Sequence, residues 1–409
     1  MVQARPRSGA GAVRPVVVLL GVLALALNLR AALTGYPPLL ETARADLGIG
    51  SGAAGLVQAG AVLMMSAGSF AAAALARAGR ERMLGVAVAA IAAGSLLRGV
   101  AALPALIAGS ALVGLGIGVA GVLLTGVVKE HLSDRVGAVT GAYVVSMMVG
   151  ATVASAAAVP LAVVLGGWPG SLAIWTVPAV LALAVWIPVA ARIARARTAA
   201  AATTEAPPVP DREPRVWQDP FARRVACYMA GSSTIFYGWV TWLSPLYESL
   251  GWSPARAGLL LAVWTVAQIP AALLMPAAAE RRGRWRFWAS VSVLTSLAGT
   301  VGAWLLPAAG TPLPVLWAVL IGIGVGAGFP LGLTVIAWRT PTPARSAAVS
   351  GLALGVGYLA AALGPVLMGV LVDVGGFGLA PVLLVVAAGL QAVAVARIGD
   401  RAPGARREA

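Results

Sequence analysis

Apolar runs of about 20 residues recur along nearly the whole length of this 409-residue chain. A helix needs about 20 apolar residues to cross the ~30 Å hydrocarbon core of a bilayer, so each run has the length of a membrane span. The chain is 60% hydrophobic and only 11% charged, whereas soluble domains are about 25% charged. A water-soluble fold could not bury so many apolar helices. The sequence therefore predicts an all-α integral membrane protein.

Twelve transmembrane helices can be placed on these runs. The predicted spans are 16–36, 53–76, 83–101, 104–128, 138–165, 169–191, 223–244, 255–278, 286–307, 313–337, 347–372 and 378–397. The first span follows basic residues and resembles a signal peptide, but its removal would leave an odd number of spans, so it is kept as a helix. The polar, Pro-rich segment 192–222 is predicted to be a flexible cytoplasmic linker. It separates an N-terminal six-helix bundle (1–191) from a C-terminal six-helix bundle with a tail (223–409).

The net charge of +15 is explained by topology. Between the spans, the connections of one side carry 25 Lys and Arg residues, and those of the other side carry only Arg44, Arg98 and Arg256. Cytoplasmic connections carry the excess of positive charge in membrane proteins. Both termini are therefore predicted to be cytoplasmic, in a bacterial inner membrane, and no nucleic-acid partner is needed to explain the basic residues.

An internal repeat relates the two bundles. Four short motifs of the first bundle recur in the same order in the second, at offsets of 203 to 210 residues. The paired motifs begin at Leu47 and Leu250, Arg77 and Arg281, Gly116 and Gly322, and Arg135 and Arg345. Parallel repeats of this kind are related by an axis along the membrane normal.

Several segments resemble the major facilitator superfamily and, within it, the cyanate/nitroimidazole transporter family. The stretch Asn28-Leu29-Arg30 with Thr34 and Pro38 looks like that family's first helix, although Ala31 replaces its usual proline. Further similar stretches are Gly114–Gly118, Val127–Lys129, Arg135–Gly137, Thr140–Tyr143, Phe236-Tyr237, Trp242-Leu243, Ser253, Ala257–Leu259, Tyr358-Leu359 and Gly364-Pro365. The resemblance implies two pseudo-symmetric six-helix bundles and transport of a small solute. The family includes importers and exporters, so it does not imply a direction.

Arg30 is the residue that most directly suggests a binding site. It lies 14 residues, or ~21 Å, from the start of the first predicted span, near mid-depth. A charged side chain at the bilayer centre costs ~2.5–3.5 kcal/mol, so it should face a watery cavity or a partner. No predicted span holds Asp or Glu in its interior. Because a guanidinium suits carboxylates and similar anions, the partner could be an anionic or electronegative solute. The alternative is that Arg30 donates to helix carbonyls or amides, or extends outward.

Further polar and aromatic residues could line the same cavity. The repeat places Ser233 opposite Arg30, and hydroxyls and aromatic rings follow it in the seventh span. The remaining candidates are amides, hydroxyls and tyrosines of other central helices, and packing or interhelical hydrogen bonding is the alternative role for all of them. The complete set of candidates is Asn28, Thr34, Gln58, Tyr143, Ser233, Tyr237, Trp239, Gln268 and Tyr358.

Two basic loops connect the second span to the third and the eighth to the ninth. Their motif residues, Arg77, Gly79 and Arg80 in the first and Arg281, Gly283 and Arg284 in the second, are expected to hold orientation and to close the inward face. Arg98 is expected to reach outward from the third span. The segment Lys129-Glu130-His131 is expected to be a solvated helix end, with proton coupling through His131 as the alternative.

Gly116-x-Gly118-x-x-Gly121 matches a dinucleotide-binding fingerprint, but it lies in an apolar helix with no preceding strand. Close helix packing through Gly114 and Gly118, and through Gly322 and Gly326, explains these glycines better.

These features favour a secondary active or facilitative transporter that moves a small anionic or electronegative solute by alternating access. The solute is expected to be cyanate-like, a small organic anion or a nitro compound. A drug efflux pump for neutral compounds with the same fold is the alternative. An intramembrane enzyme would need a metal cluster, an activated nucleophile or paired acids, and the single His at a helix end and the lack of carboxylates inside the predicted spans argue against it. No cofactor or metal is expected, and the protein is expected to function as a monomer.

Overall fold

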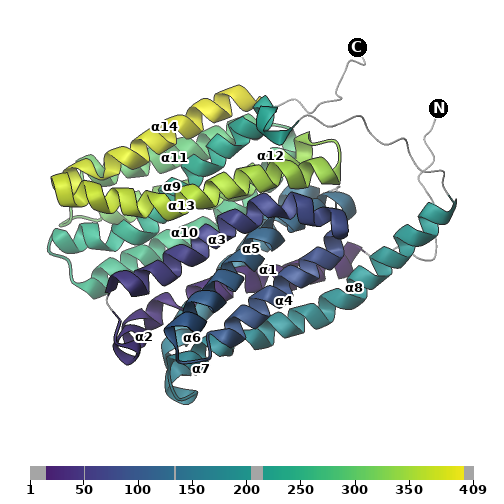
Figure 1. Cartoon of the computed structure of the whole chain (residues 1–409). Coiled ribbons are helices and arrows are strands. Elements are labelled where there is room, and N and C mark those ends of the chain that lie inside the picture. The colour runs from purple at the N-terminus through teal and green to yellow at the C-terminus, as the bar shows by residue number, and fades with distance from the viewer. Residues whose placement is uncertain (1–14, 50, 133–134, 204–214, 400–409) are drawn as a thin grey trace, which may run out of the picture.

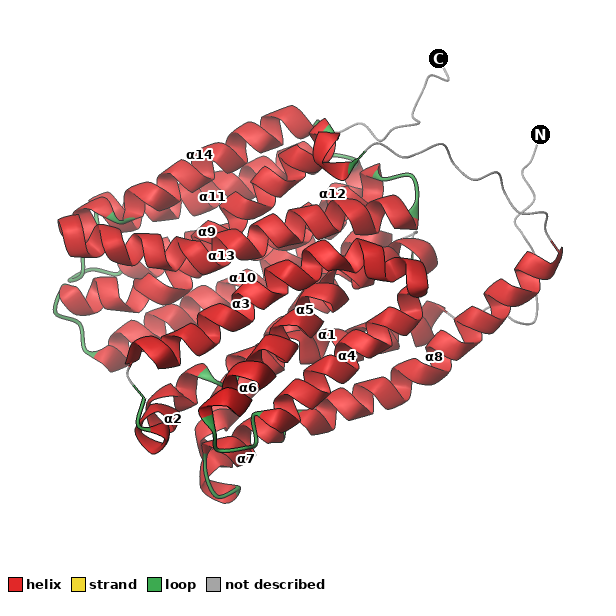
Figure 2. Ribbon diagram, in the orientation of Figure 1, coloured by secondary structure: helices red, strands yellow, loops and turns green. Residues whose placement is uncertain are grey.

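The computed structural model describes residues 15–49, 51–132, 135–203 and 215–399, which form helices joined by short connections, with no strand among them (Figure 2). The first half of the chain contains α1 (Pro15–Thr34), α2 (Leu40–Leu47), α3 (Ser51–Leu75), α4 (Arg80–Leu97), α5 (Leu103–His131), α6 (Val136–Val164), α7 (Trp168–Ala173) and α8 (Thr176–Thr203). The second half contains α9 (Pro220–Ser249), α10 (Pro254–Arg282), α11 (Trp285–Leu305), α12 (Leu313–Arg339), α13 (Pro343–Leu379) and α14 (Pro381–Ile398).

The prediction of an all-α bundle of twelve spans is confirmed, because each predicted span coincides with a long helix. Ten helices of the described part are long and apolar enough to cross a membrane by length and composition alone. The other two long helices are α4 and α9. The first turn of α4 carries three charges at 80–82, and α9 mixes hydroxyl groups and arginines with its apolar residues.

Three local features differ from the sequence analysis. The chain leaves α1 at Thr34 and forms the short polar helix α2, where a loop was expected. Helix α8 continues to Thr203, so the first part of the predicted linker 192–222 is helical. Helix α13 is interrupted at Gly375 and Gly376, where Gly376 has a φ of 62° that only glycine adopts readily. The predicted linker prolines fall at 207–214, outside the described residues.

The two halves lie side by side, α1–α8 on one side and α9–α14 on the other (Figure 1). The helices that meet across the boundary are mainly α3 with α13 and α6 with α10. We call the end of the bundle at which α8 ends and α9 begins the linker end. The opposite end, where α2 and α7 lie, is the distal end.

The outer surface of the bundle is apolar. Val163, Leu181 and Leu259 are 80%, 62% and 68% exposed, and many other large apolar side chains are similarly exposed. A soluble monomer rarely exposes so much contiguous apolar surface. Within a bilayer these side chains face acyl chains, and the helical backbone satisfies its own hydrogen bonds, as the hydrocarbon core requires.

Glycines bring the central helices into close contact, as the sequence predicted. A Cβ on Gly114 or Gly118 of α5 would lie 2.1 Å from the carbonyl oxygen of Ala61 or Met65 of α3. The repeat uses the same device, because a Cβ on Gly322 of α12 would lie 2.5 Å from a carbonyl oxygen of α10. The dinucleotide-like glycine pattern therefore serves helix packing, in which small residues let backbones approach closely.

Gly118→Ala is expected to lower the apparent Tm of the detergent-solubilised protein, because the added methyl overlaps a backbone carbonyl that cannot move independently. Overpacking of this kind costs about 1–3 kcal/mol. Gly121→Ala is the matched control, since its Cβ would meet its nearest atoms only at 3.8 Å. Equal Tm values for the two variants, measured by thermal unfolding, would contradict the packing account.

Candidate functional site

Arg30 reaches from the first half of the protein to the second. Its guanidinium carbon lies 5.5 Å from the ring centre of Phe236 and 5.9 Å from that of Tyr237, both in α9. These distances are within the ~6 Å range of a cation–π contact. The side chain is half-buried. Arg30 thus sits where the two halves meet, rather than on the lipid-facing surface.

The Arg30 guanidinium has no acidic partner within ion-pair distance among the described residues. The ion pairs found there involve Glu81, Glu130 and Asp219, which join other cations. A buried charge is stable only when it is paired or well solvated. The positive charge of Arg30 is therefore not neutralised by an acidic side chain of the described residues.

Two tyrosines lie near this guanidinium, and a third lies near one of them. The Tyr358 phenol lies within electrostatic range of both Arg30 and Tyr237, and the Tyr143 phenol lies within range of Tyr358. The hydroxyls of Tyr143 and Tyr237 are buried and make no hydrogen bond within the described part of the chain. Each phenol can donate one hydrogen bond. The helices α1, α6, α9 and α13 thus converge on one cluster of donors.

Aromatic rings form one wall of this cluster. The Phe236 ring centre lies 5.1 Å from that of Tyr237 and 5.3 Å from that of Trp264 in α10. The Trp264 indole N–H is also buried without a hydrogen bond to any described residue. Neither Phe236 nor Trp264 was among the predicted site residues. The signals that could have found them are the adjacency of Phe236 to Tyr237 and the position of Trp264 one helical turn before Gln268.

Two other candidates hydrogen-bond to helix groups rather than to Arg30. The Trp239 indole N–H donates to Thr300 Oγ1 at 3.0 Å, which directs this ring towards α11. The Gln268 amide donates to the carbonyl of Trp264 at 3.3 Å in its own helix. Neither side chain has a described contact with Arg30.

The remaining candidates also contribute to helix contacts. Asn28 donates to the Ala24 carbonyl at 2.8 Å within α1. Thr34 donates to the Arg30 carbonyl at 2.9 Å and lies 3.1 Å from the Ala151 carbonyl of α6. The Ser233 hydroxyl packs at Gly357 of α13, where a Cβ would lie 3.2 Å from it. Gln58 is half-buried, and no described contact joins it to Arg30.

Arg98 does not reach outward as expected, because its side chain is only 2% exposed. Its guanidinium donates to the Ala32 carbonyl at 2.5 Å and lies 5.9 Å from the Tyr36 ring centre. Ala32 belongs to the last turn of α1, whose free carbonyls attract a cation. Arg98 thus fixes the distal end of α1, close in sequence to Arg30.

At the linker end, side chains of each half bind the backbone of the other. The Glu280 carboxylate of α10 accepts a hydrogen bond from the Gly137 N–H, 2.6 Å away in the first turn of α6. The Lys129 ammonium of α5 donates to the Ala337 carbonyl near the end of α12. The negative charge of Glu280 thus lies at the positive N-terminal end of α6, and the positive charge of Lys129 lies at the negative C-terminal end of α12.

Hydroxyl contacts continue this closure towards the middle of the bundle. Ser66 of α3 donates to the Gly355 carbonyl of α13 at 2.8 Å, and Thr125 of α5 donates to Ser350 of α13 at 2.9 Å. The corresponding segment of α13, 351–355, is fully buried. The two halves are therefore in close contact from the linker end to the level of the Arg30 cluster.

The distal halves of the same helices are not packed together in this way. A Cβ on Gly137 or Gly141 of α6 would lie 2.5 or 2.6 Å from a carbonyl oxygen of α10. On the same face of α6, about three to four turns beyond Gly141, Thr152 and Ser155 are exposed. Gly258 of α10 is likewise exposed, and a Cβ there would meet no atom within 4 Å. The contacting faces separate towards the distal end.

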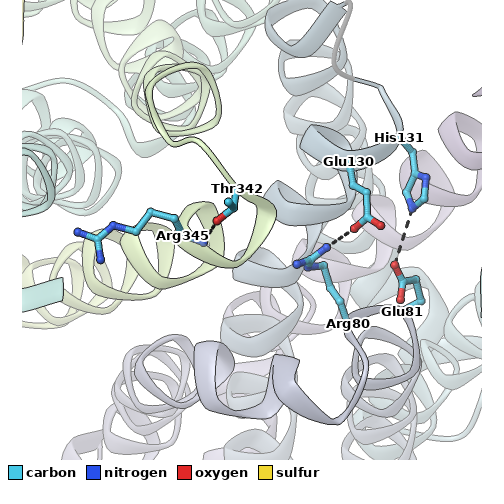
Figure 3. A network of polar contacts seen from close by, with 6 residues as sticks. All are labelled: Arg80, Glu81, Glu130, His131, Thr342 and Arg345. Atoms are coloured by element: carbon cyan, nitrogen blue, oxygen red, sulfur yellow. Dashed lines mark hydrogen bonds and ion pairs between the residues drawn. The ribbon is translucent and has the colours of Figure 1, made fainter. Parts of the chain in front are cut away.

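The first basic loop joins a network of ion pairs at the linker end (Figure 3). Arg80 pairs with Glu130, and His131 Nε2 lies 3.7 Å from the Glu81 carboxylate. The helix end Lys129-Glu130-His131 is partly solvated, as expected, because Glu130 is exposed and the other two side chains are half-buried. All three side chains also contact other helices, which the sequence analysis did not predict. Arg77 is exposed, and Gly79 has a φ of 103° at the start of α4.

The residues of the second basic loop, 281–284, lie at the surface. Gly283 ends α10 with a φ of 62°, Arg281 is exposed, and the guanidinium of Arg284 lies 5.0 Å from the Phe287 ring centre.

Among the described residues, one group combines carboxylate and imidazole ligands at metal-binding spacing. Ligand atoms of Glu81, Glu130 and His131 lie within 4.8 Å of one another. Arg80 already pairs with the Glu130 carboxylate. The positive charge of Arg80 opposes binding of a cation there, so we interpret this group as an ion-pair network.

Comparisons with known proteins give consistent results. A family model described as the Major Facilitator Superfamily matches residues 18–251 and 243–409. The 2-nitroimidazole transporter of Escherichia coli (strain K12) is 34% identical over 88% of this chain and 89% of its own length. The cyanate transport protein CynX of the same organism is 31% identical over 88% of this chain and 91% of its own length. The structure of the proton:xylose symporter XylE matches with a TM-score of 0.70 at 12% identity, covering 94% of this chain and 95% of that one, which shows a shared fold.

Proposed function

Since the chain belongs to the major facilitator superfamily, and within it to the cyanate/nitroimidazole transporter family, we propose that it carries a small anionic or electronegative solute bound at Arg30. The observation that supports this most strongly is the Arg30 guanidinium, which lies between the halves with no acidic partner among the described residues. A guanidinium presents a planar fork of donors that matches carboxylates and similar groups.

The surrounding donors suit a solute rich in acceptor atoms. The phenol hydroxyls of Tyr143 and Tyr237 are buried with no partner among the described side chains and backbone. A buried polar group without a partner costs about 1–3 kcal/mol, and a solute oxygen or nitrogen would remove that cost. Cyanate, nitro and carboxylate groups all supply such acceptors, while the Phe236 and Trp264 rings favour a planar solute.

Alternating access is the proposed mechanism. In carriers of this fold, two repeats rock about a site near the midplane. Here the halves are joined at the linker end by Glu280 and Lys129, while the distal faces around Thr152 and Gly258 are exposed. If both termini are cytoplasmic, this arrangement is an outward-facing state, and the solute reaches Arg30 from outside.

A thermal-shift screen tests the proposed solute class. The purified protein is heated with cyanate, a benzoate, a nitroimidazole, a neutral hydrophobic drug or a quaternary ammonium cation. Cyanate, benzoate or the nitroimidazole is expected to raise the apparent Tm, because a ligand at 100 times its Kd stabilises the folded state by ~2.7 kcal/mol. The cation is expected to have no effect, since it would be repelled by Arg30.

The aromatic wall of Phe236 and Trp264 also fits the second candidate function, efflux of neutral drugs. Stabilisation by the neutral drug alone would favour that function. Stabilisation by the quaternary ammonium would contradict both, because neither function provides an acidic partner for it.

A further inference from the structure

A groove of about 380 Å³ lies at the distal end of the second half, on the outside of the bundle. Trp252, Arg256, Leu260 and Val263 line it from the start of α10, and Pro312 and Val315 line it from the start of α12. It is separate from the Arg30 cluster, which lies among helices α1, α6, α9 and α13.

The part of the groove between α10 and α12 is apolar and faces the surrounding membrane. Leu259 and Val315, which also line it, are 68% and 45% exposed, whereas Leu260 is 2% exposed and forms its floor. An apolar depression on the outer surface of a membrane protein is covered by acyl chains. One chain lying between α10 and α12 would cover these side chains.

The part of the groove beside Trp252 carries a positive charge, the guanidinium of Arg256. The guanidinium carbon of Arg256 lies 3.9 Å from the ring centre of Trp252. That ring is itself held in place, because its indole N–H donates to the Ala309 carbonyl at 2.9 Å and its centre lies 4.9 Å from that of Tyr247. Stacking occupies one face of the guanidinium and leaves its edge donors directed outward. No described acidic residue forms an ion pair with Arg256.

The unequal distribution of positive charge between the two sides of the membrane does not explain the presence of Arg256. Positive charge concentrates at the linker end, and Arg256 is one of only three Lys or Arg residues assigned to the other side. The internal repeat supplies a comparison: at the offset of 203 residues, Trp252 and Arg256 correspond to Ile49 and Ala53. The first half therefore lacks both the ring and the charge.

We propose that this groove binds one anionic phospholipid, with its phosphate on Arg256 and one acyl chain between α10 and α12. Arginine binds phosphate through parallel N–H donors, which are among the stronger hydrogen bonds in proteins. An anionic lipid is favoured over a zwitterionic one, because the ammonium of a zwitterionic headgroup would lie close to the Arg256 guanidinium and be repelled by it. The asymmetry of the repeat predicts a single site of this kind.

Native mass spectrometry of the delipidated full chain tests the proposal. Phosphatidylglycerol or phosphatidylcholine is added at equal concentration, and the fraction of protein with one bound lipid is measured. Wild type is expected to bind phosphatidylglycerol more tightly than phosphatidylcholine. Arg256→Gln is expected to weaken phosphatidylglycerol binding about tenfold, the effect of losing one charge-assisted hydrogen bond.

Arg192→Gln is the matched control, because it removes an exposed arginine at the linker end of α8. It is expected to leave the affinity for phosphatidylglycerol unchanged. Arg256→Lys is expected to recover part of the affinity and so shows that Arg256→Gln has not simply unfolded the groove. Equal phosphatidylglycerol binding by wild type and Arg256→Gln, or equal binding of the two lipids by wild type, would overturn the proposal.

Discussion

Arg30→Gln is expected to lower the initial rate of solute uptake into proteoliposomes by about 100-fold. The substitution replaces a guanidinium by a neutral amide and removes charge-assisted hydrogen bonds worth about 1.5–3 kcal/mol each, and 1.4 kcal/mol corresponds to a factor of ten. The labelled solute is the small anion that gives the largest Tm increase in the thermal-shift screen. Uptake is compared at equal amounts of reconstituted protein.

Two further variants make this result specific. Arg30→Lys keeps the charge but loses the planar fork, so an intermediate rate is expected. Arg192→Gln makes the same chemical change on an exposed part of α8 and should transport at the wild-type rate. Full activity of Arg30→Gln would reject Arg30 as the binding residue, and equal loss in the Arg192 variant would attribute the effect to folding or reconstitution.

Glu280→Gln is expected to shift the protein about tenfold towards states that are open at the linker end. The carboxylate accepts the Gly137 N–H across the boundary between the halves. The neutral amide keeps one acceptor but loses its interaction with the positive end of α6. Because the contact exists only when the linker end is closed, weakening it changes the ratio of the two states directly.

Spin labels at Arg135 and Arg281 can measure this shift. Both residues are exposed and flank the Glu280 contact, and Cys227→Ser removes the only native cysteine. Distance distributions from pulsed electron paramagnetic resonance should gain a longer component in the Glu280→Gln variant. Glu248→Gln, at an exposed position near the end of α9, should leave the distribution unchanged. Identical distributions for the Glu280 variant and wild type would show that this contact does not hold the closed state.

The sequence predicted the bundle well because membrane spans are specified locally. Each span is an apolar run of sufficient length, and this requirement does not depend on neighbouring helices. The short helix α2 was missed because its sequence, Leu40–Leu47, is polar and eight residues long. The extension of α8 to Thr203 follows an Ala- and Arg-rich stretch whose helix propensity is high.

The binding cluster was predicted only in part because a helix's rotation about its own axis is set by packing. Tyr237 and Trp239 were both assigned to the cavity, but two residues along a helix turn by about 200°. The structure directs Tyr237 towards Arg30 and Trp239 towards Thr300. Tyr143 and Tyr358 come from distant parts of the chain, and no pattern in a single sequence measures how far apart they lie in the fold.

The contacts at the linker end were missed for a related reason. Glu280 and Lys129 lie at helix ends, where charged side chains are normally solvated. Their partners are backbone groups of Gly137 and Ala337, which carry no signal in the sequence. Only the packing of α6 against α10, and of α5 against α12, brings these groups together.

An experimental structure with the most stabilising small anion would show directly whether Arg30 binds the solute. We expect an acceptor atom of the anion to lie within hydrogen-bond distance of the Arg30 guanidinium and of at least one tyrosine hydroxyl of the cluster. An Arg30 paired with an acidic side chain of the protein itself, with the anion bound elsewhere, would contradict it.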